Sequence, residues 1–445
     1  MPSQRPLLRV LGAGFGLAVV IGGTIGLGIL RSPAVVAGHA GSPTVAMLFW
    51  VIGGVYALLA AAAYADLATR IARSGGVYVY AREALGDGAG FLFGWTDLLA
   101  TCSTIAFAGL GFAEFVSLLW PGLAPWRPAL ALLAIVLFCL GQLPGIRPSR
   151  VVHELGAFIK AVLFLLLIGG LLFLAPPAPP GPAADTQATA ALLLPGLAAT
   201  VLAMQLVLGA YDGWAGGIYF TGEDRAPERN PPPAILGGVL IVIVVYLLMN
   251  LALLRVLPFE QLAASPLPAA DAARAWLGER GATLVTVVAA VSLLPLLNGT
   301  LLVSSRIAHA MASDGLLPRA LAGVTVRGTP APALITVSLT GMLLVFASGG
   351  ILNLVIAAGA LFAVFTYLGG FLSLLVLHRR QVAEPGRFRA PGHPLTTWLL
   401  LAVSAALFIG VVLSAPRDSL VVMVALALAW PLHRLRSRRK RGALP

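Results

Sequence analysis

The stretch Ile21-Gly-Gly-Thr-Ile-Gly-Leu-Gly-Ile-Leu30 decides the fold that we predict for this chain. It lies within the apolar residues 11–36, and about 20 apolar residues suffice for a helix to cross a bilayer. Each glycine inside a helix costs roughly 1 kcal/mol relative to alanine, so this run of glycines predicts a helix that breaks. In lipid, unwound backbone occurs only where protein encloses it or where it lines a cavity. We therefore predict a broken membrane helix beside a buried site.

A second glycine-rich apolar segment, residues 192–220, lies five predicted spans further along the chain. The glycines that interrupt it are Gly209, Gly213, Gly216 and Gly217. Two broken helices at matching places in the two halves of a membrane protein are typical of secondary transporters, whose substrate site lies between them near the bilayer midplane. The two segments together therefore indicate a transporter.

The composition of the chain favours membrane residence. Hydrophobic residues make up 59% of the chain and charged residues 10%, against roughly 25% charged residues in soluble domains. We predict an all-α, polytopic membrane protein with twelve transmembrane helices and no removable signal peptide. The predicted spans are residues 9–37, 43–70, 89–119, 128–145, 151–175, 191–220, 234–257, 282–312, 331–348, 351–377, 395–414 and 418–433.

The net charge of +12 is distributed as in a membrane protein rather than a nucleic-acid-binding one. With the N-terminus in the cytoplasm, most basic residues fall in cytoplasmic segments, and an excess of Lys and Arg marks that side. Residues 435–445 then form a basic cytoplasmic tail near anionic lipid. We expect a multi-pass protein of the cytoplasmic membrane with both termini inside. The basic residues predicted to face outward are Arg31, Arg127, Arg255, Arg274, Arg280 and Arg417.

A proline-rich connector, Ala175-Pro-Pro-Ala-Pro-Pro-Gly-Pro182, separates the fifth and sixth spans. It divides the first ten spans into two groups of five, each opening with a glycine-broken helix. Because five is odd, the groups cross the membrane in opposite senses, as inverted repeats do. We predict one transporter domain over residues 1–434, with repeats at about 9–175 and 191–377 and extra helices at about 395–433.

The ends of a broken helix offer both signs of partial charge. Free amides at a half-helix N-terminus attract an anion, and free carbonyls at a half-helix C-terminus accept from a cation. A zwitterion satisfies both, so we expect an amino acid carboxylate and ammonium at the two breaks. The alternative is that the glycines only allow close helix packing. The expected carboxylate ligands are the backbone of Gly26, Leu27 and Gly28, and the expected ammonium ligands are carbonyls near Gly23, Thr24, Gly209 and Ala210.

Ordered motifs along the chain resemble those of the amino acid–polyamine–organocation superfamily, especially its L-type amino acid transporter branch and bacterial relatives. The resemblance implies the five-plus-five inverted-repeat fold of the leucine transporter with helices 1 and 6 broken, alternating access, and an amino acid substrate. It also adds Tyr211 and Trp214 to the site. The motifs that carry it are Ile21 to Pro33, Ser74-Gly-Gly-Val-Tyr-Val-Tyr80 with Gly86 and Phe93-Gly-Trp95, Tyr211-Asp-Gly-Trp214, Pro227-Glu-Arg-Asn-Pro231, Asn298-Gly-Thr300, Ser305-Arg306, Asp314-Gly-Leu-Leu-Pro318, Gly328-Thr-Pro330 and Arg387-Phe-Arg-Ala-Pro-Gly392.

This chain departs from the superfamily pattern at three positions. Leu27 stands where a serine is usual, Gly209 where an aromatic gate residue is common, and Ala215 where a polar residue is frequent. Backbone alone must then bind the carboxylate. Two consequences stay open: the pocket admits a larger apolar side chain, or Tyr211 and Trp214 close it.

Lys160 lies inside an otherwise apolar span, where a charge costs roughly 2.5 kcal/mol or more, so we expect it to face the protein interior. Sodium-coupled relatives bind a cation between helices 1, 5 and 8, and the resemblance implies that this ammonium stands in for the ion. Its expected partners are a carbonyl near Gly22 and a hydroxyl such as Ser292. Two alternatives are a proton carrier and an amine that extends to the surface beside Glu154.

Two acidic residues near the breaks have competing interpretations. Asp212 either accepts the substrate ammonium or caps the half-helix that follows. Asp97, in the third span, is expected to be an edge or packing charge. No metal-ligand spacing, phosphate loop or nucleophile motif is present, so we expect no enzyme activity, no metal site and no cofactor.

We therefore predict sodium-independent exchange or proton-coupled uptake of neutral L-amino acids. One alternative is a cationic amino acid or polyamine exchanger, which would need carboxylates lining the distal pocket, and the third, eighth and tenth spans supply none at mid-depth. The other alternative is a non-transporting amino acid sensor. The resemblance implies that a disulfide-linked ancillary subunit is absent, because residues 119–127 contain no cysteine. We expect a monomer or weak oligomer, with amino acid and membrane lipid as partners and no nucleic acid.

Overall fold

The computed structural model describes residues 6–179, 196–347, 352–380, 388–414, 419, 420, 424 and 427. This part of the chain is all helical and contains no strand, with one isolated bridge between Leu11 and Asp224. The all-α prediction is confirmed. Within the described ranges, eight helices are long and apolar enough to cross a membrane, or nine if a bent helix pair counts as one span. The chain is a membrane protein, and twelve spans remain a prediction.

The helices follow the predicted spans closely, and five short described helices, α4, η1, α10, α11 and η4, lie in the connections between them. Most of the last predicted span, the tail 435–445 and residues 180–182 of the connector lie outside the described residues. In chain order the helices are α1 (Ala13–Thr24), α2 (Leu27–Ala40), α3 (Pro43–Arg70), α4 (Val77–Leu85), α5 (Asp87–Leu119), η1 (Pro121–Trp126), α6 (Arg127–Gln142), α7 (Ile146–Phe173), α8 (Leu197–Tyr211), η3 (Trp214–Glu223), α9 (Pro231–Val256), α10 (Phe259–Ala264), α11 (Pro268–Leu277), α12 (Glu279–Ser313), η4 (Arg319–Ala322), α13 (Ala331–Ala347), α14 (Leu352–Arg379) and α15 (Leu395–Ser414).

The turn between α2 and α3 illustrates how local sequence sets the helix ends. Gly41 follows α2 with φ 72°, a left-handed conformation that favours glycine at a helix C-terminus. Ser42 is the N-cap of α3, and its Oγ accepts a hydrogen bond from the Val45 amide at 3.3 Å. Pro43 occupies the first position of α3, where its missing N–H costs nothing. This short turn returns the chain antiparallel beside the broken first helix.

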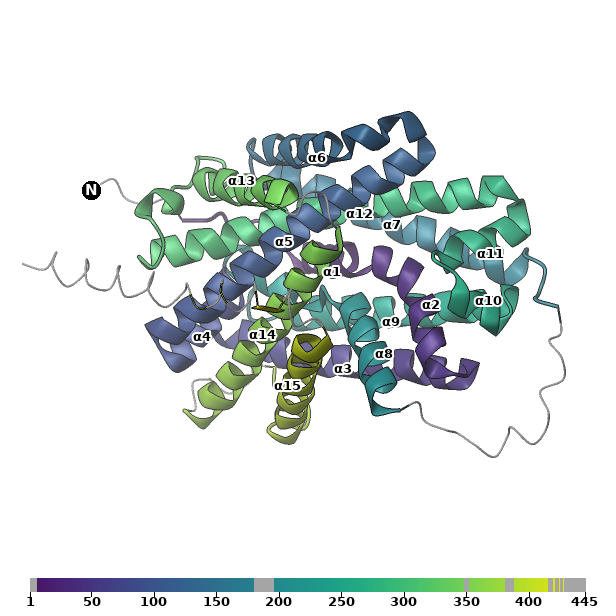
Figure 1. Cartoon of the computed structure of the whole chain (residues 1–445). Helices are drawn as coiled ribbons and strands as arrows, with labels where there is room; N and C mark the ends of the chain where they lie inside the picture. The colour runs from purple at the N-terminus through teal and green to yellow at the C-terminus, as the bar shows by residue number, and fades with distance from the viewer. Residues whose placement is uncertain are drawn as a thin grey trace, which may run out of the picture.

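Helix α1 lies in the interior of the bundle, while α4 lies at the end opposite to α10 and α11 (Figure 1). At one end of α1, the backbones of Leu11 and Glu223 are joined by an N–H to carbonyl hydrogen bond of 3.0 Å. Arg306 of α12 forms a buried, two-pronged ion pair with Glu223, with N–O distances of 3.0 and 3.1 Å. These contacts tie the start of α1, the end of η3 and α12 together.

Candidate functional site

The first break separates α1 from α2, whose axes differ by 46°. Helix α1 ends at Thr24, Ile25 is extended, and Gly26 is the N-cap of α2. The first turn of α2 begins at Leu27, so its amides have no partner within the helix and carry the positive end of the helix dipole. These are the amides that we assigned to a substrate carboxylate, and that role remains a proposal.

The second break separates α8 from the 3-10 helix η3. Helix α8 ends at Tyr211, Asp212 is extended, and Gly213 has φ 120°, a conformation that L side chains rarely adopt. The Gly213 amide donates to Asp212 Oδ1 at 2.7 Å. The Tyr367 hydroxyl of α14 donates to the same oxygen. Asp212 Oδ1 is thus held by the Gly213 amide and the Tyr367 hydroxyl, while Gly213 is the N-cap residue of η3, and both interpretations of Asp212 stay predictions.

The two breaks touch each other. A Cβ on Gly213 would lie 2.7 Å from Thr24 Oγ1 and 2.8 Å from the Gly23 carbonyl carbon, and a Cβ on Gly28 would lie 3.0 Å from the Ala210 Cα. Glycine at positions 28 and 213 is thus required for close packing. Gly26 is different, because no atom lies within 4 Å of the position of its absent Cβ. The open space at Gly26 is where a ligand could reach the α2 amides.

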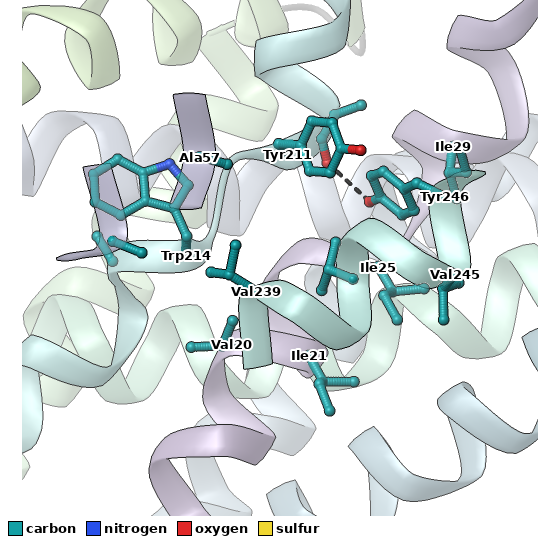
Figure 2. Close-up of a cluster of buried hydrophobic side chains, with 14 of the residues drawn as sticks. Val20, Ile21, Ile25, Ile29, Ala57, Tyr211, Trp214, Val239, Val245 and Tyr246 are labelled. Carbon is teal, nitrogen blue, oxygen red and sulfur yellow. Dashed lines mark hydrogen bonds between the residues drawn. The ribbon is translucent and has the colours of Figure 1, made fainter. Parts of the chain in front are cut away.

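Tyr246 of α9 joins the two breaks through a single hydroxyl. Its oxygen lies 2.7 Å from the Thr24 carbonyl oxygen and 2.8 Å from the Ala210 carbonyl oxygen. One hydroxyl proton can donate to only one carbonyl at a time, so the other keeps a free lone pair. Figure 2 shows Tyr246 beside Tyr211 and Ile25, with Trp214 at the left of the view. The sequence analysis missed Tyr246, and its only signal was a hydroxyl in the middle of an apolar helix.

Lys160 of α7 lies against α1 at the start of the first break. Its side chain is 1% exposed, and Nζ donates to the Gly22 carbonyl oxygen at 2.8 Å. This is the carbonyl named in the sequence analysis. The other expected partner, Ser292, instead donates to the Ala289 carbonyl oxygen of its own helix at 2.8 Å.

The aromatic residues of the second break are buried and engaged. The Tyr211 hydroxyl donates to the Trp50 carbonyl oxygen at 3.1 Å, and the Trp214 ring packs against Tyr64 and Tyr367 with centroid distances of 4.8 and 4.9 Å. Gly209 is exposed, with no atom near its absent Cβ. Both rings are therefore engaged within the protein, and position 209, where the resemblance implies an aromatic gate residue, is exposed and outside the cavity lining.

A cavity of about 150 Å³ lies beside the breaks. It reaches the broken helices at Gly23, Asp212 and Gly213, and Ala215 also lines it. Three other helices, α5, α12 and α14, contribute the rest of its wall. The remaining lining residues are Val19, Gly216 and Tyr219 of α1 and η3, Asp97, Ala100, Thr101 and Thr104 of α5, Leu296, Gly299, Thr300 and Val303 of α12, and Ala363, Thr366 and Tyr367 of α14.

Asp97, which we expected to be an edge or packing charge, is buried rather than at an edge. Its side chain is 3% exposed and lines the cavity, and its Oδ1 accepts a hydrogen bond from the Tyr219 hydroxyl at 3.0 Å. The third predicted span therefore contributes a carboxyl group to the cavity wall. Among the described residues, no group of three or more His, Cys, Asp or Glu side chains could hold a metal.

Comparison with known proteins identifies the family. The family model described as amino acid permease matches residues 16–432. The chain belongs to the amino acid permease family. This permease is thereby a member of the amino acid–polyamine–organocation superfamily, as its motifs predicted.

Individual relatives cover most of the permease. It is 30% identical to the mouse b(0,+)-type amino acid transporter 1 over 392 residues, which are 85% of this chain and 78% of that protein. It is 27% identical to the serine/threonine exchanger SteT of Bacillus subtilis, over 92% of this chain and 91% of that protein. It is 31% identical to the rat large neutral amino acids transporter small subunit 2, over 77% and 65% respectively. All three are named as transporters or exchangers, and the permease is an amino acid transporter rather than an enzyme.

Proposed function

We propose that the permease moves L-amino acids across the cytoplasmic membrane by alternating access, binding the substrate's carboxylate and ammonium at the two helix breaks. The observation that carries this proposal is the contact between the breaks. The α2 amides begin beside open space at Gly26, while the carbonyls of Thr24 and Ala210 share one hydroxyl proton. Donors and acceptors thus meet at one buried place, which suits a zwitterion.

The proposal includes the topology expected from the sequence: twelve transmembrane helices in one domain, two inverted repeats of five, and both termini in the cytoplasm. It is supported by the two breaks, which occur at the first helix of each predicted repeat. It is also supported by the position of two arginines that we predicted to face outward. Arg274 lies in α11 and Arg280 lies beside it, at the end of the bundle opposite to α4 (Figure 1).

Coupling is proposed to be independent of sodium. The buried Lys160 amine donates to the Gly22 carbonyl at the first break, where its protonated form supplies a positive charge. A fixed ammonium removes the need for a bound cation, and the transport mode is then exchange or, if the amine gives up its proton, proton-coupled uptake. The contact between Lys160 and Gly22 supports the idea that the amine replaces a bound cation. Transport measurements distinguish exchange from proton-coupled uptake.

A disulfide-linked ancillary subunit is not part of the proposal. The chain has two cysteines, Cys102 and Cys139, and both are buried within helices. Neither is in the loop 119–127, so no thiol is available there for a bond to a partner. We propose that the permease works as a monomer or weak oligomer in the lipid bilayer.

The experiment is thermal stabilisation of the purified permease by each of the twenty amino acids, followed by counterflow of every binder in proteoliposomes. A ligand at about 100 times its Kd stabilises by about 2.7 kcal/mol, which is a clear shift in Tm. Binding with counterflow supports a transporter. Binding without counterflow would favour the sensor alternative, and the absence of any amino acid effect would refute the proposal.

A further inference from the structure

The polar lining of the central cavity is composed of hydrogen-bond acceptors. The hydroxyls of Thr104, Thr300 and Thr366 donate to carbonyls four residues earlier in their own helices, at 3.0, 2.8 and 2.9 Å. Thr101 does the same toward Asp97 and Leu98, at 3.0 and 3.1 Å. A hydroxyl has one proton and two lone pairs, so each threonine presents only lone pairs to the cavity.

The two tyrosines of the lining have also used their protons. The Tyr219 hydroxyl donates to Asp97 Oδ1 at 3.0 Å, and the Tyr367 hydroxyl donates to Asp212 Oδ1. Every lining side chain that carries a hydroxyl therefore has its proton engaged within the protein. A ligand in this cavity gains hydrogen bonds only by donating them.

One lining acceptor has no partner at all. Asp97 Oδ2 is buried and makes no hydrogen bond, while Oδ1 is held by Tyr219. Two carboxyl groups, Asp97 and Asp212, line the cavity, and none of the described residues that line it is basic. A carboxylate buried without a counter-charge is costly, so this wall favours a ligand that brings a positive charge.

We propose that Asp97 is the specificity-determining residue for the substrate's side chain, and that its Oδ2 accepts a hydrogen bond from a protonated amine at the end of that side chain. The assignment rests on the proposed function, because it presupposes an amino acid held at the breaks. An ammonium matches the lining better than a hydroxyl or an amide does. It offers three donors and a positive charge to a wall of acceptors, whereas a hydroxyl offers one donor and no charge.

The first experiment uses the wild-type protein and two ligands that differ by the amine. L-lysine and L-norleucine share the same backbone and the same four-carbon chain, so the ratio of their affinities isolates the terminal ammonium. We expect L-lysine to bind about tenfold or more tightly than L-norleucine in a thermal-shift titration. L-glutamine is the neutral donor in the comparison and is expected to bind more weakly than L-lysine.

The second experiment changes Asp97. The isosteric variant Asp97→Asn removes the charge and keeps the shape, and we expect it to lose most of the preference for L-lysine while its affinity for L-norleucine changes little. Glu114→Gln is the matched control. Glu114 is on the same helix, pairs with Arg31 at 2.8 Å and does not line the cavity, so its variant should keep the wild-type ratio.

The outcomes separate this inference from the proposed function. If L-norleucine or L-glutamine binds the wild type as well as L-lysine, Asp97 is not an ammonium receptor, although the transporter assignment stands. If Asp97→Asn loses affinity for L-lysine and for L-norleucine equally, Asp97 holds the α-ammonium and the inference is overturned. If no amino acid binds the wild type, the proposed function fails as well. Should the variant not fold, a wild-type affinity ratio near one still overturns the inference.

Discussion

Removal of the Lys160 amine is the sharpest test of how the first break is held open. Lys160 Nζ donates to the Gly22 carbonyl at 2.8 Å, and the side chain is 1% exposed. A hydrogen bond that involves a charged group contributes about 1.5–3 kcal/mol. If the substrate-binding form of the break depends on this bond, Lys160→Ala should weaken substrate binding by roughly 10- to 150-fold.

Lys160→Gln is the matched variant, because it keeps an N–H donor and removes the charge. We expect it to retain part of the activity that Lys160→Ala loses. The assay is uptake of a radiolabelled substrate into proteoliposomes, with sodium and the pH gradient varied independently. Wild-type uptake should not respond to sodium.

The same assay separates the two roles of the amine. A proton carrier predicts that wild-type uptake depends on pH and that Lys160→Gln loses this dependence, whereas a structural amine predicts pH-independent exchange in both. Sodium-stimulated uptake by the wild type, or normal uptake by a well-expressed Lys160→Ala, would refute the reasoning.

Three further substitutions test the breaks. Gly26→Val should insert and fold, because no atom lies within 4 Å of its absent Cβ, but it should abolish binding by filling the carboxylate's space; unchanged uptake would remove the first break from the site. Tyr246→Phe removes the hydroxyl shared by the Thr24 and Ala210 carbonyls, and should lower the unfolding free energy by about 1–3 kcal/mol in thermal denaturation; an unaltered Tm would show that water replaces it. Leu27→Ser should be tolerated and tighten binding by about 0.5–1.5 kcal/mol in a ligand titration; loss of transport with normal expression would contradict the carboxylate placement.

The structure also separates glycines that the sequence treats alike. Gly26 and Gly28 flank the same residue and were assigned the same role. Gly28 faces the Ala210 backbone, and Gly26 faces open space. The difference depends on how closely α8 approaches α2, and these two helices are nearly two hundred residues apart in the chain. A side chain at position 28 would meet the Ala210 backbone and one at position 26 would not, while the role of both backbones in carboxylate binding stays a proposal.

The sequence by itself determined the class of the protein and the site of the first break. Glycine disfavours the helix through its own backbone, so the interruption between Thr24 and Leu27 is a local property that needs no tertiary contact. Membrane residence follows equally locally, from long runs of apolar side chains. Lys160 could also be placed, because a lone charge in an apolar span has no alternative but to face the interior or extend to the surface.

Only the tertiary structure decided which polar side chains line the cavity. Asp97 and Tyr367 lie on helices that are apolar on nearly all sides, and such a helix carries no pattern that reveals which face is turned inward. Their rotation is set by packing against helices distant in the chain. Asp97 thus looked like a packing charge in the sequence and lies at the cavity wall in the fold, because burial of one carboxyl oxygen depends on Tyr219 from the other half of the protein.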